Sequence, residues 1–546
     1  MTSPAITRRD LFAAATVAGA SLRAQAPSAD FVEVRTASGR LRGSRSNGLC
    51  TFKGIPYTGP ISGANRFKAA PKLQPWTGVR DALEFGAPSL QPGQRRNEPA
   101  QSEDCNFLNI WTPAADGRKR PVMFYSHGGG FTTGSAASAY QDGGNLARTM
   151  DVVVVATNHR LGLFGYLFLG DLGGEEYATS GNQGLLDIQD GLKWAQQNIE
   201  AFGGDPGNVM IFGESGGGAK TSCLYAMPAT APYFNKASIE SGPGIRMSPR
   251  ENAAETALLT LKHFGLEKSE WRKLLDIPAE KLLAAQVALG QTGGGPLTMN
   301  GGRKGMGGGG RPGGFGPVVD GTILPTHPFD PVAPAVSKNK PLIVGYNRDE
   351  TIFFFQQQRN TAIFELSEAT LKERLAKEFP ANAEAVYEAY SKSRPSASPT
   401  DLYVAISTAR MIAVGASTIA ERKYRQHGAP VYSYIFTRES DAIVPGTQHK
   451  VGAAHALEIP YKFNITQNLN IGPMTSTTSP EAVKTAHNMS EMWSTFARTG
   501  RPAAAGQPAW PAFTTEKRAT MEINAECRVV EDPYPLERRL WERLDP

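Results

Sequence analysis

Short, continuous runs of apolar and β-branched residues recur along the chain, and segments with helical periodicity separate them. Five such runs lie at residues 121–125, 151–156, 209–212, 341–345 and 431–436. Continuous apolar runs of this length fit strands that are covered on both faces, as in a parallel sheet. A helix is predicted over residues 187–199, where apolar residues recur at spacings of three and four. Strands that alternate with helices predict an α/β fold.

Residues 293–316 interrupt this pattern, because 13 of these 24 residues are glycine. Glycine at this density does not hold regular structure. The segment is either a linker between two domains or a surface loop within one domain. Since the alternation of strands and helices resumes directly after it, we expect a mobile surface loop. Residues 27–546 are then expected to form a single domain.

The N-terminus has the pattern of an export signal. Arg8 and Arg9 precede a short apolar stretch at residues 11–20, and an A-x-A pattern follows at residues 24–26. This order is typical of a twin-arginine signal peptide, which predicts removal of residues 1–26 and a periplasmic or secreted protein. Cleavage after residue 20 and a merely basic, unprocessed N-terminus are the alternatives. No later segment is expected to be apolar enough to span a membrane.

Composition narrows the class of protein further. Of the 546 residues, 40% are hydrophobic and 20% are charged, as in an ordinary globular protein. The net charge of +6 is spread along the chain, which argues against a nucleic-acid partner. The four cysteines form no C-x-x-C pair, so a zinc or redox motif is not expected, although an exported chain could form one disulfide. These cysteines are Cys50, Cys105, Cys223 and Cys527.

The candidate chemistry centres on a serine between glycines. Residues 213–217 fit the pattern G-x-S-x-G, with Ser215 in the middle. The pattern alone also fits a flexible loop. An apolar run precedes it, however, and a helix-compatible segment at residues 219–226 follows, which is the strand–turn–helix setting of a nucleophile. A turn this sharp would strain the backbone of Ser215 and leave no room for Cβ atoms at the flanking glycines.

A serine hydroxyl needs a base, and the base needs a group that orients it. In folds with this turn, the acid and then the histidine follow the nucleophile along the chain. Six histidines follow Ser215, and spacing does not select one of them. They are His263, His327, His427, His449, His455 and His487.

Further motifs lie along nearly the whole chain: GIPY at 54–57, RF at 66–67, EDCNFLNIW at 103–111, HGGGF at 127–131, NHRLGLFGYL at 158–167, GNQGLLD at 181–187, FGGDPGNVMIFGESGGG at 202–218, GPVVDG at 316–321, MWSTFARTGRP at 492–502 and WPAF at 510–513. They resemble those of the type-B carboxylesterases, a family that includes cholinesterases and many bacterial esterases. The motifs occur in the family's order. The resemblance implies an α/β-hydrolase fold with a large, mostly parallel central sheet, and hydrolysis of small-molecule carboxylic esters.

The resemblance also implies a catalytic triad. Ser215 corresponds to the nucleophile, Glu350 in VGYNRDET to the acid, and His455 in GAAHALEIPY to the base. Asp349 beside Glu350 and the nearby His449 are the alternatives. The chemistry of such a triad needs no metal and no organic cofactor.

An oxyanion hole is implied in the same way. The backbone N–H groups of Gly129, Gly130 and Gly216 correspond to the family's donors. Unhindered backbone donors suit this task because they must approach a tetrahedral oxyanion closely. The family usually has alanine at the position of Gly216, so the N–H is kept and a looser turn is expected.

Further residues correspond to structural positions of the family. Arg66 with Glu103, and Arg160 with Asp187, are expected to form internal ion pairs. Glu214 either supports the catalytic site or is an ordinary acid at a helix start. Ser241 is expected to support the catalytic residues without contacting the substrate.

Two departures from the family concern a cysteine and the acyl pocket. The cysteine that usually bridges to the one in EDC is absent, so Cys105 is expected to be a buried, unpaired thiol. Before GPVVDG only Phe315 supplies an aromatic ring, which predicts a wide acyl pocket walled partly by the glycine-rich segment. A non-catalytic binding protein of the same fold, and an acyltransferase or amidase with the same triad, are the alternative functions.

Overall fold

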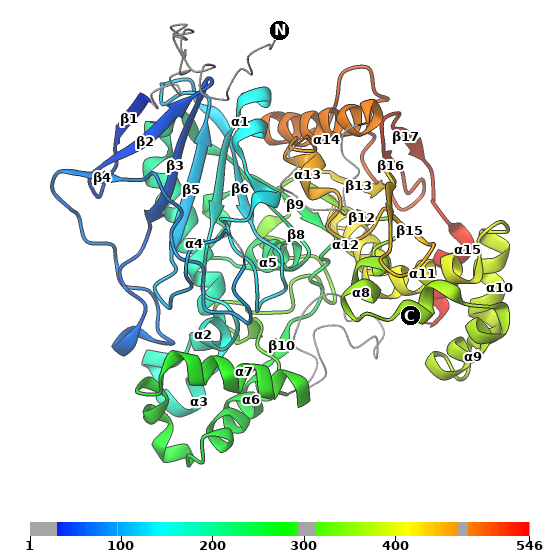
Figure 1. The fold of residues 1–546 in the computed structure, drawn as a ribbon, viewed down its shortest axis with the longest axis horizontal. Coiled ribbons are helices and arrows are strands. Elements are labelled where there is room, and N and C mark those ends of the chain that lie inside the picture. The colour runs from blue at the N-terminus through cyan, green and yellow to red at the C-terminus, as the bar shows by residue number, and fades with distance from the viewer. Residues whose placement is uncertain (1–29, 96, 293–311, 468–478, 545–546) are drawn as a thin grey trace, which may run out of the picture.

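The computed structural model describes residues 30–544, except residues 96, 293–311 and 468–478 (Figure 1). The predicted signal peptide at residues 1–26 lies outside the described residues. Of the predicted glycine-rich loop, only residues 312–316 are described.

A sheet of 13 strands forms the centre of the molecule, in the order β1-β2-β3-β5-β7-β6-β8-β9-β12-β13-β16-β17, with β4 beside β2. The strands from β7 to β16 run parallel to one another, and antiparallel strands extend the sheet at both edges. The predicted mostly parallel sheet is therefore confirmed. Its strands are β1 (Asp30–Arg35), β2 (Arg40–Ser46), β3 (Leu49–Pro56), β4 (Val79–Asp81), β5 (Phe107–Thr112), β6 (Arg120–Ser126), β7 (Val153–Thr157), β8 (Gly204–Glu214), β9 (Lys236–Glu240), β12 (Leu342–Asn347), β13 (Val431–Phe436), β16 (Thr520–Ile523) and β17 (Arg528–Val530).

The five apolar runs of the sequence form the parallel strands β6, β7, β8, β12 and β13, with boundaries within a few residues of those expected except for the start of β8. Their apolar character follows from burial on both faces. In β6, Val122 and Phe124 face one hydrophobic core, whereas Met123 and Tyr125 face another. A strand that alternated between apolar and polar residues would expose one of these faces.

Helices cover both faces of the sheet (Figure 1). Residues of α4, α5 and α12 belong to the core on one face, and residues of α1, α13 and α14 belong to the core on the other. Helices α8 to α11 and α15 pack around a third core beside the end of the sheet where the last strands lie. The remaining short strands are β10 (Ser248–Pro249), β11 (Val318–Val319), β14 (Ser440–Ile443) and β15 (Lys450–Gly452). The helices are α1 (Gly144–Met150), α2 (Gly162–Tyr166), α3 (Gly170–Gly173), α4 (Gln183–Asn198), α5 (Gly216–Ala226), α6 (Arg250–His263), α7 (Ala279–Thr292), α8 (Thr351–Gln357), α9 (Glu368–Glu378), α10 (Ala383–Ser393), α11 (Pro399–Thr408), α12 (Val414–Tyr424), α13 (Ile459–Lys462), α14 (Pro480–Thr499) and α15 (Pro535–Leu544).

One long helix corrects an expectation about apolar segments. Helices α11 and α12 join through a π-helical turn, Ala409–Ala413, into a continuous helix at Pro399–Tyr424. By length and mean hydropathy alone this helix could cross a membrane, so the expectation that no later segment is apolar enough is wrong on composition. Within its most apolar window, however, 67% is buried inside the structure. Packing in the core accounts for most of the apolar residues of this window.

Candidate active site

Ser215 lies at the sharp turn between β8 and α5. Its backbone has φ 58° and ψ −123°, a conformation that residues with a side chain rarely adopt. The flanking glycines are required by space. A Cβ on Gly213 would lie 2.5 Å from the carbonyl carbon of Gly217, and a Cβ on Gly217 would lie 2.1 Å from the carbonyl oxygen of Ser126. The turn has the strand–turn–helix form that the sequence predicts.

Glu350 and His455 are brought together from segments 105 residues apart in the chain. Glu350 lies between β12 and α8, and His455 lies between β15 and α13. The Nδ1 atom of His455 is 2.5 Å from Oε2 of Glu350, and both side chains are buried. A carboxylate at this nitrogen holds the imidazole in one orientation and stabilises its cation.

Burial and hydrogen bonding act in opposite directions on the pKa of Glu350, and together they leave it raised to about 8. Burial raises the pKa of this carboxyl group, whereas a hydrogen bond of 2.8 Å from the backbone N–H of Asn347 and the hydroxyl group of Ser241 oppose the rise. Ser241 itself has a positive φ of 47°. Ser241 thus lies beside Glu350, where it can support the candidate acid, as the resemblance implies.

Glu214 touches the other side of the histidine. It is the last residue of β8 and is 2% exposed, and its Oε1 lies 3.3 Å from Nε2 of His455. Burial raises the pKa of Glu214, and His455 opposes that rise. An ordinary acid at a helix start would be solvated, so this contact favours a supporting role for Glu214. Because Glu214 directly precedes Ser215, the contact also places Nε2 of His455 beside the turn that carries Ser215.

A second buried acid completes this region, and sequence reasoning missed it. Glu458 is fully buried, and burial raises its pKa to about 7. Its Oε2 accepts a hydrogen bond of 2.5 Å from Asn347, and its Oε1 lies 3.4 Å from the Ser241 hydroxyl. The only signal in the sequence is its position three residues after His455, at the start of the short helix α13.

The glycines of HGGGF form a loop whose N–H groups point to no partner. Gly129 and Gly130 have positive φ angles of 88° and 62°. Among the described residues, none accepts a hydrogen bond from their backbone N–H groups. A Cβ on Gly216 would lie 2.2 to 2.4 Å from the backbone O, Cα and N of Gly130, so the two backbones are in direct contact. The backbones that carry the three expected donors therefore lie together, and a Cβ at Gly216 would collide with Gly130. The looser turn expected at Gly216 stays a prediction.

The alternative acid and base have other partners. Asp349 accepts a hydrogen bond of 2.9 Å from the backbone N–H of Ala453 and pairs with Arg348 at 2.9 Å. His449 lies 3.0 Å from Asp401 through its Nε2 atom. Within the described chain, neither residue forms a hydrogen bond or ion pair with His455 or with the turn at Ser215.

Known proteins are similar in sequence to this chain over most of its length. The model of the carboxylesterase family matches residues 30–541. The chain belongs to the carboxylesterase family. It is 34% identical over 513 residues to the para-nitrobenzyl esterase of Bacillus subtilis. The aligned region covers 93% of this chain and 97% of that protein. It is also 30% identical to the phenmedipham hydrolase of Pseudarthrobacter oxydans, over 90% of this chain and 94% of that protein.

Solved structures agree with this assignment. The Geobacillus stearothermophilus carboxylesterase EST55 superposes with a TM-score of 0.79 at 36% identity, over 93% of this chain and 99% of the other. The fold is therefore that of the α/β-hydrolases, and the chain is a carboxylesterase, an enzyme that hydrolyses carboxylic esters.

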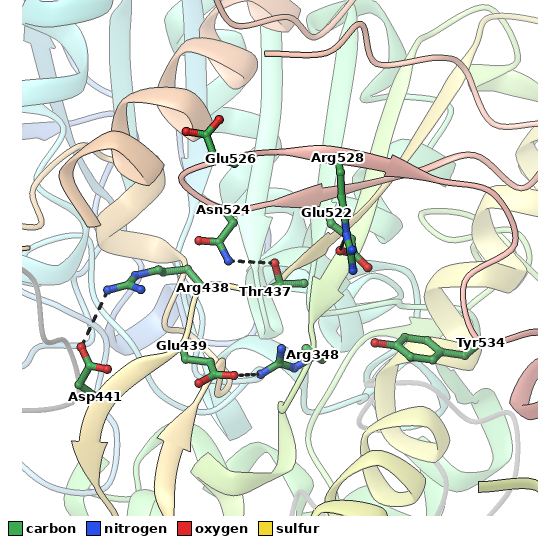
Figure 2. Close-up of a pocket in the computed structure, with 10 residues that line it drawn as sticks. All are labelled: Arg348, Thr437, Arg438, Glu439, Asp441, Glu522, Asn524, Glu526, Arg528 and Tyr534. Atoms are coloured by element: carbon green, nitrogen blue, oxygen red, sulfur yellow. Dashed lines mark hydrogen bonds and ion pairs between the residues drawn. The ribbon is translucent and has the colours of Figure 1, made fainter. Parts of the chain in front are cut away.

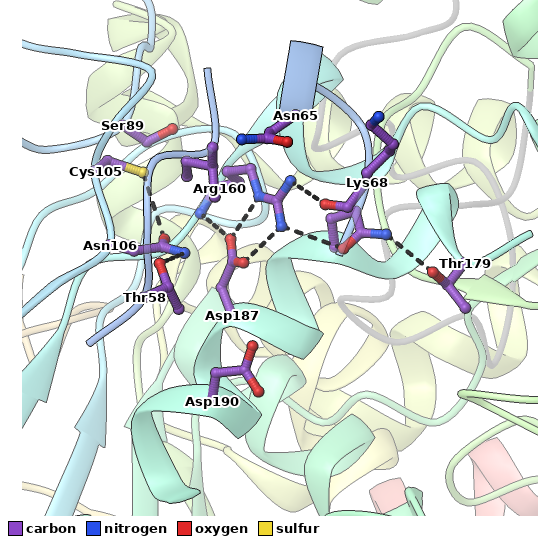
Figure 3. A network of polar contacts seen from close by, with 12 residues as sticks. Thr58, Asn65, Lys68, Ser89, Cys105, Asn106, Arg160, Thr179, Asp187 and Asp190 are labelled. Carbon is purple, nitrogen blue, oxygen red and sulfur yellow. Dashed lines mark hydrogen bonds and ion pairs between the residues drawn. The ribbon is translucent and has the colours of Figure 1, made fainter. Parts of the chain in front are cut away.

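The two expected ion pairs of this carboxylesterase are confirmed. Arg160 forms a two-pronged contact with Asp187, with distances of 2.8 and 2.7 Å, and both side chains are buried (Figure 3). Arg66 contacts Glu103 in the same way, at 2.7 and 2.6 Å. Removing one partner of a buried pair typically costs about 3–5 kcal/mol of stability, because the other charge stays buried. Arg160 also donates a hydrogen bond to the backbone carbonyl of Lys68. The ion pair of Arg160 and Asp187 is thereby linked to the segment between β3 and β4.

All four cysteines are buried and unpaired. The expectation for Cys105 is thereby confirmed, and burial raises the pKa of its thiol. Phe315, the one aromatic residue expected at the acyl side, is 5% exposed and belongs to the main hydrophobic core. Among the described residues, no group of three or more histidine, cysteine or acidic side chains could hold a metal ion.

A separate polar cavity of about 440 Å³ lies beside the hairpin of β16 and β17 (Figure 2). Its three arginines, Arg348, Arg438 and Arg528, each have an acidic partner, which are Glu439, Asp441 and Glu522 in that order. None of the candidate catalytic residues lines it. The cavity is therefore distinct from the candidate active site. Its arginines are each paired with an acid, so they leave no excess of positive charge to bind an anion.

Proposed function

We propose that this carboxylesterase hydrolyses esters through Ser215, His455 and Glu350 by way of an acyl-enzyme. The observation that carries the proposal is the buried contact of 2.5 Å between Glu350 and His455, beside the strained turn of Ser215. A buried carboxylate and imidazole in contact next to a strained serine are the parts that nucleophilic acyl transfer requires.

In the proposed mechanism each of these residues has its own role. Ser215 Oγ attacks the carbonyl carbon of the ester, and Nε2 of His455 takes the hydroxyl proton. Glu350 stabilises the resulting imidazolium through Nδ1. The N–H groups of Gly129, Gly130 and Gly216 donate to the oxyanion of the tetrahedral intermediate. Nε2 then returns the proton to the leaving alcohol, and water repeats the sequence on the acyl-enzyme.

Nε2 of His455 has no hydrogen bond within the described chain and lies 3.3 Å from Glu214. In the resting enzyme we infer that this nitrogen faces Glu214, and that it moves to Ser215 Oγ when an ester occupies the site. Catalytic hydrogen bonds are often long before substrate binds, and they tighten in the Michaelis complex. Glu214 then remains close enough to stabilise the imidazolium from its second side.

Product analysis tests this function against acyl transfer. With p-nitrophenyl esters whose acyl groups have two to ten carbon atoms, in water, we expect the free acid as the main product. The wide acyl pocket that the sequence predicts would give activity across short and medium acyl chains. Added methanol or ammonia should divert only a minor share of the acyl group. A main product that is the new ester or amide would make the chain an acyltransferase, and a sharp preference for acetyl would contradict the wide pocket.

A further inference from the structure

Lys220 is completely buried, and it has no acidic partner among the described residues. It lies on α5, five residues after Ser215, and is 0% exposed. Burying an amine without a counter-ion is costly. Burial accordingly lowers the pKa of Lys220 to about 7. Stability alone does not explain a lysine at this position.

Its ammonium group makes one hydrogen bond within the described chain. Nζ of Lys220 donates to the backbone carbonyl oxygen of His127 at 3.0 Å. This carbonyl belongs to the peptide that leads from β6 into residues 127–134, which we call the oxyanion loop because they include Gly129 and Gly130. The lysine thus contacts the loop where it leaves the sheet.

Helix α5 meets the same peptides at a second point, and the far end of the loop is also fixed. A Cβ on Gly217 would lie 2.1 Å from the carbonyl oxygen of Ser126 and 3.1 Å from that of His127, so the first turn of α5 touches the end of β6. At the other end, the side chain of Gln91 exchanges two hydrogen bonds of 2.8 Å with the backbone of Gly134. Lys220 thus contacts the loop at its entry, opposite the end that Gln91 holds.

The groups packed against Lys220 supply no negative charge. The rings of His127 and His159 stack at 4.6 Å, and burial together with the nearby Lys220 lowers the pKa of both well below its usual value. Both rings therefore stay neutral. The ring of Phe131 lies 6.0 Å from Nζ. The carbonyl of His127 is consequently the one acceptor that the described chain offers to this ammonium group.

We propose that Lys220 is a positioning residue for the oxyanion hole, because its hydrogen bond to His127 fixes the peptides that lead to the N–H groups of Gly129 and Gly130. This inference rests on the proposed function of those N–H groups. Donors that are slightly displaced contact a developing oxyanion poorly, but they matter little to a neutral ester in the ground state. The effect is therefore expected on kcat and not on KM.

The test compares Lys220→Met with a matched control in the full-length enzyme. Lys423 is also fully buried and also donates to backbone carbonyls, one of them that of Ser337 at 3.1 Å, but it lies away from the site. With p-nitrophenyl butyrate, we expect Lys220→Met to lower kcat about 10- to 100-fold with KM within twofold. Affinity for a trifluoromethyl ketone, which forms a tetrahedral oxyanion on the serine, should fall by a similar factor. Lys423→Met should leave all three quantities within twofold.

Each other outcome decides against the proposal. Unchanged kcat in Lys220→Met, or a loss that appears in KM alone, would overturn it, as would an equal loss in Lys423→Met. If Lys220→Met does not fold, Lys220→Leu repeats the test. Failure of both to fold beside a folded Lys423→Met would assign Lys220 to folding instead. Turnover by the unmodified enzyme in the same assay reports the proposed function separately, since only the ratio of variant to unmodified enzyme concerns Lys220.

Discussion

Replacing Ser215 with alanine is expected to lower kcat for p-nitrophenyl butyrate by about 10⁴- to 10⁶-fold. The substitution removes the only nucleophile at the strained turn and leaves the oxyanion donors and the binding site in place. Alanine needs the same positive φ as serine, so the turn itself keeps its geometry. The measurement is steady-state turnover, with the folded state checked by thermal denaturation.

A nearby buried serine provides the control for this result. Ser222 lies on the same helix and donates its hydroxyl hydrogen to the carbonyl of Gly218, so it belongs to the packing of α5. Ser222→Ala should keep kcat within a few fold. Turnover by Ser215→Ala near the rate of the unmodified enzyme would remove Ser215 from the mechanism and would favour a binding protein with adventitious activity.

Glu350→Gln is expected to lower kcat by about 10³- to 10⁴-fold with little change in KM. Glutamine keeps the size of the side chain and can still accept the hydrogen bond from Asn347. It carries no charge, however, so it does not stabilise the imidazolium of His455, and its amide can hold the ring in the wrong tautomer. Steady-state kinetics of the purified variant measures both constants.

The adjacent acid offers a matched comparison. Asp349 is one residue away, and its carboxylate serves Ala453 and Arg348 instead of His455. Asp349→Asn should therefore keep kcat within about tenfold, with a loss of stability as its main effect. A large loss of kcat in Asp349→Asn together with near-normal Glu350→Gln would reverse the assignment of the acid.

The sequence predicts the parallel strands well where buried positions are occupied by apolar residues. The run that forms β6 is apolar at successive positions because helices cover both faces of the sheet. Strand β9 escaped prediction although it lies between β8 and β12 in the middle of the sheet. Its sequence, KASIE, contains Lys236, Ser238 and Glu240, all buried.

Partners from distant segments make this burial tolerable. Lys236 donates to the carbonyl of Ala497 at 2.9 Å, and Glu240 accepts from Trp493 at 2.6 Å and pairs with Lys462. These contacts join residues more than 200 positions apart. The local sequence pattern does not reveal these long-range contacts. A buried strand with polar residues therefore looks like a surface segment in the sequence.

The site shows the same division. The turn of Ser215 is local, and glycine spacing predicts it. The choice of Glu350 and His455 came from the family resemblance, because residue spacing alone left several histidines open. Glu458 and the contact of Glu214 with His455 became visible only in the fold. The signal peptide and the role of the glycine-rich segment stay predictions, since most of their residues lie outside the described chain.

Covalent labelling tests the catalytic account most directly. A p-nitrophenyl alkylphosphonate transfers its phosphonyl group to an activated serine and releases one p-nitrophenol per site. The account predicts one equivalent of p-nitrophenol per chain, the label on the peptide that contains Ser215, no labelling of Ser215→Ala, and labelling of Glu350→Gln that is slowed by about the same factor as its kcat. A label on another residue, or equal labelling of Ser215→Ala, would contradict it.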